Sequence, residues 1–585
     1  MAQPEARSAG RRPIAYKWIA LSNTTLGVLM AMINTTILII SLPAIFRGIH
    51  VNPLEPSQTS LLLWVMLSFN VATTILLVTF GRISDTYGRV RLYNAGFAIF
   101  TLGSILCFLT PGVGLGGEWE LIAFRFLQGI GGAFLFANSA AILTDAFPAN
   151  ERGLALGLNQ VAAIGGQVIG LVLGGLLSAV DWRLVFLVSV PIGILGTIWA
   201  YVALQEQVSE REPARLDIVG NITFGLGVLG ILVGLTYGII PYAGHAMGWA
   251  SPLVRVSIVG GALLLAVFVW VEGRVASPLF HLGLFRIRAF LAGNLSGFLA
   301  SVGRGGLQFM MVIWLQGIWL PLHGVPYVNT PLQAGIDTLP QMAGFLVAGP
   351  VSGRLSDRYG ARWFGFAGML LAALGFGLLS LLGADFAYWQ FAACIFLVGA
   401  GMGVFASPNS AAIMSSVPAL YRGAASGMRS TFQNAGMMMS MGIFFTIVIA
   451  GMSSHLPKAL FDGLSAFGLP RAVASGLAKL PPTETLFAAL LGYNPMAHLV
   501  APSVLHALPA AKARILVGER YFPHLISGPF MAALRTVFLF SLAMSVIAAV
   551  VSLLRGGRYI ARDEALPERT AGAGARRPER EAGGA

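Results

Sequence analysis

The feature that most constrains this chain is a series of long apolar runs separated by short polar breaks. A helix needs roughly 20 mostly apolar residues to cross about 30 Å of hydrocarbon. The sequence offers fourteen such runs, with approximate starts at residues 18, 59, 91, 119, 154, 182, 216, 252, 288, 330, 363, 387, 424 and 529. Charged residues make up only 10% of the 585, too few to cover a soluble surface. We therefore expect an all-α membrane protein with fourteen spans.

Positive charge predicts how these spans are oriented, because short cytoplasmic loops are enriched in Lys and Arg. Such residues lie before the first run, in alternate loops and after the last run, as at Arg12, Lys17, Arg89, Arg152, Arg211, Arg286, Arg358, Arg422 and Arg555. We expect both termini in the cytoplasm. The net charge of +13 then reflects topology, and no nucleic-acid partner is expected.

An internal repeat divides the chain into two halves. The matching segments are residues 81–88 and 353–360 (272 apart), 138–142 and 409–413 (271 apart), and 152–153 and 422–423 (270 apart). All copies fall on the predicted cytoplasmic side, so the repeat is parallel. This predicts two six-helix bundles related by a pseudo-two-fold axis along the membrane normal, with two inserted helices.

These patterns predict five segments. They are a cytoplasmic segment (1–17), a six-helix bundle (18–205), a two-helix insert with linkers (206–280), a second six-helix bundle (281–556) and a disordered cytoplasmic tail (557–585). The second bundle includes a long extracytoplasmic loop, residues 453–527, with moderately apolar stretches that fit no clean span. We expect short helices lying on or near the outer surface there.

The repeated loop motif is the first candidate functional feature. Its residues are Gly81, Asp85, Gly88 and Arg89 in the first copy, and Gly353, Asp357 and Gly360 in the second. Glycines permit a sharp turn, and the aspartate can cap a helix or pair with an arginine.

With this motif the chain resembles the major facilitator superfamily, and most closely its fourteen-span drug:proton antiporter family. The resemblance covers nearly all of the chain except the long outer loop and the tail. It implies that Gly81, Asp85, Gly88 and Arg89 form a cytoplasmic gate latch. It also implies a small-molecule substrate, protons as the coupling ion and a bacterial inner membrane as the setting. We expect a monomer.

Two span motifs extend the resemblance. Span four holds Arg125 and Gln128, similar to the family motif with an intramembrane arginine tied to proton transfer. Span five carries glycines at the spacing of the antiporter motif, at which helices can approach and bend: Gly157, Gly166, Gly170, Gly174 and Gly175. Leu171 replaces the family's proline, which predicts a weaker kink. Structural pairing of Arg125 and plain helix packing of the glycines remain alternatives.

Span one departs from the family at the position of its acidic residue. The segment with Asn34 and Thr36 resembles a motif that begins with aspartate, and Asn34 cannot titrate. Asp337 in span ten and Arg304 in span nine lie at similar depths, and we expect them to form an ion pair. That pair could be structural or a protonatable gate.

Three functions follow from these patterns. The first is a secondary exporter of small lipophilic compounds or drugs, driven by protons through alternating access. The second is an exporter of lipid or cell-envelope components, with an envelope partner at residues 453–527. The third is a receptor or scaffold without transport. We expect no enzymatic activity, cofactor or metal: only four lysines occur, none follows glycine as in a phosphate-binding loop, and the histidines show no metal spacing.

Overall fold

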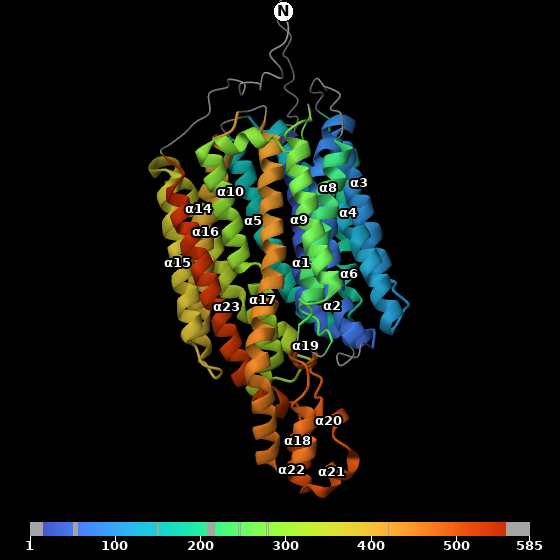
Figure 1. The fold of residues 1–585 in the computed structure, drawn as a ribbon. Helices are drawn as coiled ribbons and strands as arrows, with labels where there is room; N and C mark the ends of the chain where they lie inside the picture. Colours follow the sequence, from blue (N-terminus) through green and yellow to red (C-terminus); the bar gives the residue numbers. More distant parts are fainter. Residues whose placement is uncertain are drawn as a thin grey trace, which may run out of the picture.

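The computed structural model describes residues 16–50, 56–148, 151–206, 217–418 and 421–556, without residues 244, 246, 276, 277 and 279. The described chain folds into long helices that run roughly parallel, with a small lobe of short helices at one end (Figure 1). We name the end at Tyr16 and Leu553 the terminal face, and the end that carries the lobe the lobe face.

Two groups of helices form the body. The first consists of α1 (Tyr16–Gly48), α2 (Pro56–Tyr87), α3 (Arg89–Phe108), α4 (Gly114–Ala146), α5 (Arg152–Ser178), α6 (Leu184–Leu187) and α7 (Ser189–Ala203). The second consists of η1 (Leu282–Arg286), α10 (Arg288–Arg304), α11 (Leu307–Val312), η2 (Ile313–Trp319), α12 (Leu320–Leu322), α13 (Thr330–Asp337), α14 (Leu339–Tyr359), α15 (Ala361–Leu381), α16 (Tyr388–Ser415), α17 (Arg422–Phe467) and α23 (Tyr521–Leu553).

The same packing pattern occurs in both groups. In the first, α1 packs on α5, α2 on α4, α3 on α4 and α3 on α7. In the second, α10 packs on α17, α14 on α16, α15 on α16 and α15 on α23. The sequence repeat is therefore also a repeat of helix contacts, and the expected architecture of two helical bundles is confirmed.

A separate helix pair, α8 (Ile218–Gly238) and α9 (Pro252–Glu272), packs on itself and meets the bundles through α8, which contacts α2 and α17. Phe224 and Phe268 hold the pair together with Phe280, and their ring centroids are 5.2 to 5.7 Å apart. The pair thus covers the junction between the bundles.

Thirteen helices in the described residues are long and apolar enough to cross a membrane. They match thirteen of the fourteen predicted spans. The remaining one, predicted to start near residue 330, is divided into α13 and α14 at Thr338. Pro340 follows closely, and proline cannot donate the backbone hydrogen bond that a continuous helix needs there. The polar residues of α14 also reduce its hydropathy, among them Gln341, Ser352, Arg354 and Arg358.

The lobe departs from the predicted loop boundary. Helix α17 continues through residue 453 to Phe467 and ends where Gly468 adopts a left-handed φ of 104°. The Leu469 N–H donates to the Leu464 carbonyl at 3.1 Å, which closes the helix end. Four short helices then form the lobe in Figure 1: α18 (Arg471–Leu477), α20 (Met496–Leu499), α21 (Pro502–Ala507) and α22 (Ala510–Leu516).

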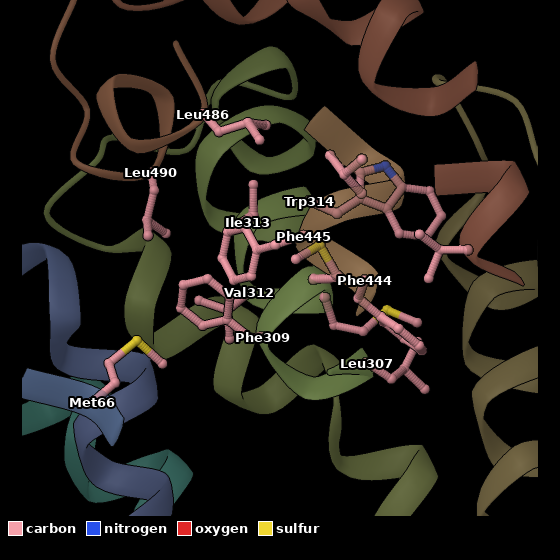
Figure 2. Close-up of a cluster of buried hydrophobic side chains, with 14 of the residues drawn as sticks. Met66, Leu307, Phe309, Val312, Ile313, Trp314, Phe444, Phe445, Leu486 and Leu490 are labelled. Carbon is pink, nitrogen blue, oxygen red and sulfur yellow. The ribbon is translucent and has the colours of Figure 1, made fainter. Parts of the chain in front are cut away.

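One segment of the predicted surface loop is in the core instead. Helix α19 (Pro482–Leu490) is buried along its whole length and contacts η2, α17 and α2. Figure 2 shows Leu486 and Leu490 of α19 in one cluster with Ile313, Phe445 and Met66. The expectation that this region lies on the outer surface is therefore wrong for α19, because its side chains are almost all apolar or small and are removed from solvent by three other elements.

Candidate transport pathway

Arg125 on α4 is a deeply buried charge of the first bundle, with 1% of its surface exposed. Its Nη1 donates to the Asn34 side-chain oxygen on α1 and to Gln128 Oε1 at 2.6 Å. Gln128 in turn donates to Ser104 Oγ at 2.7 Å, and the Phe69 ring lies 4.9 Å from the guanidinium carbon. The structure thus brings together three of the predicted site residues, Asn34, Arg125 and Gln128.

The chemistry of this network is that of a charge held by neutral groups. Both acceptors of Arg125 in the described part of the chain are amide oxygens, and a carboxylate at position 34 would have neutralised the guanidinium. Arg125 Nε and Asn34 Nδ2 are buried and have no hydrogen-bond partner among the described residues. An intramembrane charge that is left uncompensated is costly, which favours a functional role over a structural one.

Span five approaches span one as its glycines predict. A Cβ added at Gly166, Gly170 or Gly174 would lie 2.7 to 2.9 Å from a backbone carbonyl of α1. Thr36 on α1 donates to the Gln167 carbonyl of α5 at 3.1 Å. Helix α5 is continuous from Arg152 to Ser178, and the weaker kink expected from Leu171 stays a prediction.

The other two glycines of span five differ from this group. Nothing lies within 4 Å of a Cβ added at Gly157, so close helix approach does not explain that residue. At the opposite end, a Cβ at Gly175 would contact the backbone of Leu332 on α13, and one at Gly335 would lie 2.9 Å from the Leu171 carbonyl. The lobe-face end of α5 therefore packs tightly against the second bundle.

The repeated loop motif forms a tight turn in both bundles. Gly88 and Gly360 have φ values of 110° and 86°, which L side chains rarely adopt. A Cβ added at Gly81 would meet nothing within 4 Å, whereas one at Gly353 would meet Ser407 Oγ at 2.7 Å. The side chains of Asp85 and Asp357 lie outside the described part of the structure.

Arg89 of this motif binds an acid that the sequence reasoning left unassigned. Its Nη1 donates to both carboxylate oxygens of Asp145 on α4, at 2.8 and 2.7 Å. The carboxylate of Glu206 accepts from the backbone N–H groups of Arg89, Val90 and Arg91, and so satisfies the first turn of α3. Opposite charges at the ends of neighbouring spans were the available signal for this contact.

The predicted ion pair between Arg304 and Asp337 is wrong. Asp337 accepts from Gln333 Nε2 at 3.0 Å, and its Oδ2 is buried without a partner. Arg304 makes no hydrogen bond or ion pair in the described part of the chain. Similar depth along two helices did not bring the side chains together, because α13 packs against α1, α5 and η2.

Sequence reasoning also missed Arg555, which it treated as one of the loop charges. Arg555 is 4% exposed and donates to Ser296 Oγ at 2.7 Å and to the Asn409 side-chain oxygen. Burial lowers the pKa of Arg555 to about 10, so the side chain remains charged at neutral pH. It fastens the chain after α23 to α10 and α16, and Asn409 of the repeated motif was the sequence signal.

Glu484 on the buried helix α19 is the second residue that was missed. It is 6% exposed and forms no hydrogen bond or ion pair within the described residues. Burial raises the pKa of its carboxyl to about 7. Thr483, its neighbour, donates to the Ile239 carbonyl after α8 at 3.2 Å, which connects α19 to the inserted helix pair.

The chain has two membrane-spanning bundles, a buried charge inside the first bundle and glycine turns at one face. These features are typical of a membrane transporter. The model of the Major Facilitator Superfamily matches this chain over residues 24–438 and 293–557, so the chain belongs to that superfamily.

Relatives and a solved structure agree with this assignment. The multidrug resistance protein Stp of Mycobacterium tuberculosis is 29% identical over 86% of this chain and 92% of its own length. The riboflavin transporter RibZ of Clostridioides difficile is 28% identical over 73% of this chain and 87% of its own. A bacterial homologue of the human lysosomal transporter Spinster shares the fold, with a TM-score of 0.57, 16% identity and coverage of 93% and 97%.

Proposed function

We propose that this chain is a secondary active transporter that exports small lipophilic compounds, including drugs, by alternating access coupled to protons. The observation that carries the proposal is Arg125, a fully buried charge held by Asn34 and Gln128 inside a two-bundle membrane fold. The name of the relative Stp supports drugs as the substrate class, and the name of RibZ extends it to other small organic molecules.

The proposed topology identifies the face at which an exported substrate would leave. The arginines of the repeated motif lie at the terminal face, and so does Arg555. We therefore place that face on the cytoplasmic side of a bacterial inner membrane. Substrate would then leave at the lobe face, where α19 and the contact of α5 with α13 close the bundles. We expect the working unit to be a monomer.

The coupling site cannot be Asn34, because an amide does not titrate. Asp337 is the best candidate in the described spans, since it is a buried carboxyl held by a single neutral donor, Gln333. A carboxyl in that setting can exchange a proton without breaking an ion pair. We therefore assign proton exchange to Asp337, and to Arg125 a coupling role within the first bundle, where its contacts with Asn34 and Gln128 lie.

The test is proton flux in inverted membrane vesicles that contain the protein. A pH-sensitive dye reports the internal pH while ethidium or riboflavin is added. Substrate-dependent proton release that disappears in Arg125→Ala and Asp337→Asn would support antiport. Arg535→Ala is the control, because Arg535 lies exposed on α23 and, among the described residues, donates only to the Ser380 carbonyl, at 2.9 Å.

Two other outcomes would contradict parts of the proposal. Movement of labelled substrate without proton release would refute antiport and leave a carrier driven by another gradient. Absence of movement for every compound, in protein shown to be folded, would refute transport and favour a receptor or scaffold.

Export of lipid or envelope components is a second candidate, and the lobe is the observation that favours it. Leu499, Ile515 and Val517 expose 37 to 56% of their surfaces there, beyond the body of the bundles. Replacing residues 496–517 by a short polar linker removes this surface and retains α19. Loss of lipid export with unchanged dye export would support a partner at the lobe, and unchanged export of both would remove this candidate.

A further inference from the structure

The helix pairs α1/α5 and α10/α17 occupy corresponding places in the two bundles, and their packing gives the alignment. A Cβ at Gly166 of α5 would lie 2.7 Å from the Leu29 carbonyl of α1. A Cβ at Gly436 of α17 would lie 2.9 Å from the Phe298 carbonyl of α10. The glycines are 270 residues apart and the carbonyls 269 apart, so positions in the two pairs can be compared to within one residue.

The first difference between the pairs is at Asn159 and Arg429, which are 270 residues apart. Asn159 Nδ2 donates to Ser139 Oγ at 3.0 Å, and Arg429 Nη1 donates to Ser410 Oγ at 2.9 Å. The same hydrogen bond is thus made by an amide in one bundle and by a guanidinium in the other. The other acceptor of Arg429 is Gln433 Oε1 at 3.3 Å, so no carboxylate balances its charge among the described residues.

The second difference is at Asn34 and Arg304, also 270 residues apart. Asn34 accepts from Arg125, whereas Arg304 makes no hydrogen bond or ion pair in the described part of the chain. Arg429 Nε is buried without a hydrogen-bond partner among the described residues, whereas Arg429 Nη2 and the guanidinium nitrogens of Arg304 are not fully buried. Both side chains are partly buried and still present free N–H donors to accessible space.

The two arginines lie at different depths on helices that pack against each other. Arg429 is seven residues into α17 and Arg304 sixteen into α10, about 10 Å and about 24 Å from the terminal face. The two guanidinium groups are therefore too far apart to bind the same small group at the same time. Unpaired charges inside a membrane protein are expensive and are kept where they meet a ligand or an ion.

We propose that α10 and α17 form an anion-binding path, with Arg429 and Arg304 as two successive contacts for the acidic group of a lipophilic organic anion. The inference rests on the proposed function and names its substrate class as compounds with a carboxylate, sulfonate or phenolate on an apolar body. A guanidinium offers such a group two parallel N–H donors, and the apolar helices around it accept the remainder of the molecule.

Binding of two dyes with one ring system and opposite charge tests the proposal. Fluorescein is anionic and tetramethylrhodamine methyl ester is cationic, and fluorescence anisotropy measures the affinity of each for the purified full-length protein in a neutral detergent. We expect the wild type to prefer fluorescein. Arg429→Gln and Arg304→Gln should each weaken fluorescein binding about tenfold, the loss expected for one charge-assisted hydrogen bond.

Two further variants make the result specific. Arg429→Lys keeps the charge and should retain most of the affinity, whereas Arg535→Gln removes an exposed arginine of the same bundle and should change nothing. Each variant is first compared with the wild type by size-exclusion chromatography and thermal unfolding. Binding of the cation should not weaken in any of them.

Preference for the cationic dye, binding of neither dye, or unchanged fluorescein affinity in both glutamine variants would overturn the anion path. The outcome is independent of proton coupling, because no membrane or gradient is present. A protein that pumps ethidium against a proton gradient and does not bind fluorescein retains the proposed function and loses this inference. A protein that binds fluorescein at both arginines but moves no protons loses only the antiport.

Discussion

The contact between α1 and α5 provides a prediction whose size can be worked from the structure. Gly170→Ala adds a Cβ that would lie 2.7 Å from the Ile33 carbonyl oxygen and would contact the Thr36 hydroxyl. Ordinary contacts of this kind begin at 3.4 Å, so α1 and α5 must separate by about 0.7 Å. The carbonyl belongs to the helix backbone and cannot rotate away, and overpacking of this kind costs about 1–3 kcal/mol.

Gly157→Ala on the same helix is the matched control. Nothing lies within 4 Å of its added Cβ, so this variant experiences only the change in helix propensity, a gain of about 0.5–1 kcal/mol. Gly170→Ala receives a similar propensity gain. The difference in unfolding free energy between the two variants therefore measures the clash alone, with Gly170→Ala the less stable by about 1–3 kcal/mol.

Thermal unfolding of both variants in one detergent measures the difference, and substrate transport in vesicles gives its consequence. Gly170→Ala should also lose transport, because Thr36 would be displaced from the Gln167 carbonyl. Equal stability and equal transport in the two alanine variants would show that the close approach of α1 and α5 has no energetic importance.

Three further predictions concern α19 and the terminal face. Burial in the folded protein raises the pKa of Glu484 from 4.5 to about 7. The packing of α19 in the core should therefore become less stable as pH rises between these two values, and it should not change further at higher pH. Trypsin cleavage at Lys479 measures this pH dependence, which Glu484→Gln should abolish. Phe487→Ala removes a buried ring stacked on a phenylalanine of α17, with centroids 6.1 Å apart, and should increase the same cleavage at every pH through a loss of about 3–5 kcal/mol. Arg89→Ala breaks a partly exposed ion pair, so thermal unfolding should change by less than about 1 kcal/mol while vesicle transport falls if the motif is a latch.

Much of the fold could be predicted because the bilayer makes the sequence pattern simple. A spanning helix must be apolar over a fixed length, and thirteen of the fourteen predicted spans meet that condition. The exception shows the limit of the rule, since Pro340 and the polar residues of α14 interrupt a segment that still packs on α16. The burial of α19 was not predictable from length, because nine residues are too few to span and a short apolar helix can lie on a surface or in a core.

The site was predicted less completely, for reasons of geometry. Asn34, Arg125 and Gln128 came together because the family motifs place them on adjacent helices. Arg304 was given the wrong partner because depth fixes one coordinate of a side chain and the rotation of each helix fixes the rest. Arg429 belongs to no motif, and the comparison of its hydrogen bond with that of Asn159 shows that the two halves of the repeat differ in charge there.

The residues at positions 34, 304 and 429 all affect one quantity, the net charge inside the helical bundles. The resemblance predicts an aspartate where Asn34 stands, and its absence leaves Arg125 held by amides alone. Arg304 and Arg429 add positive charge without a carboxylate partner in the described residues. An organic anion inside the bundle restores the balance. It also changes the driving force: export of one negative charge from a cytoplasm at negative potential is favourable by about 2.3 kcal/mol per 100 mV. A carrier of anions can therefore draw on the membrane potential in addition to the proton exchange assigned to Asp337, and such a substrate does not require a titratable group in span one.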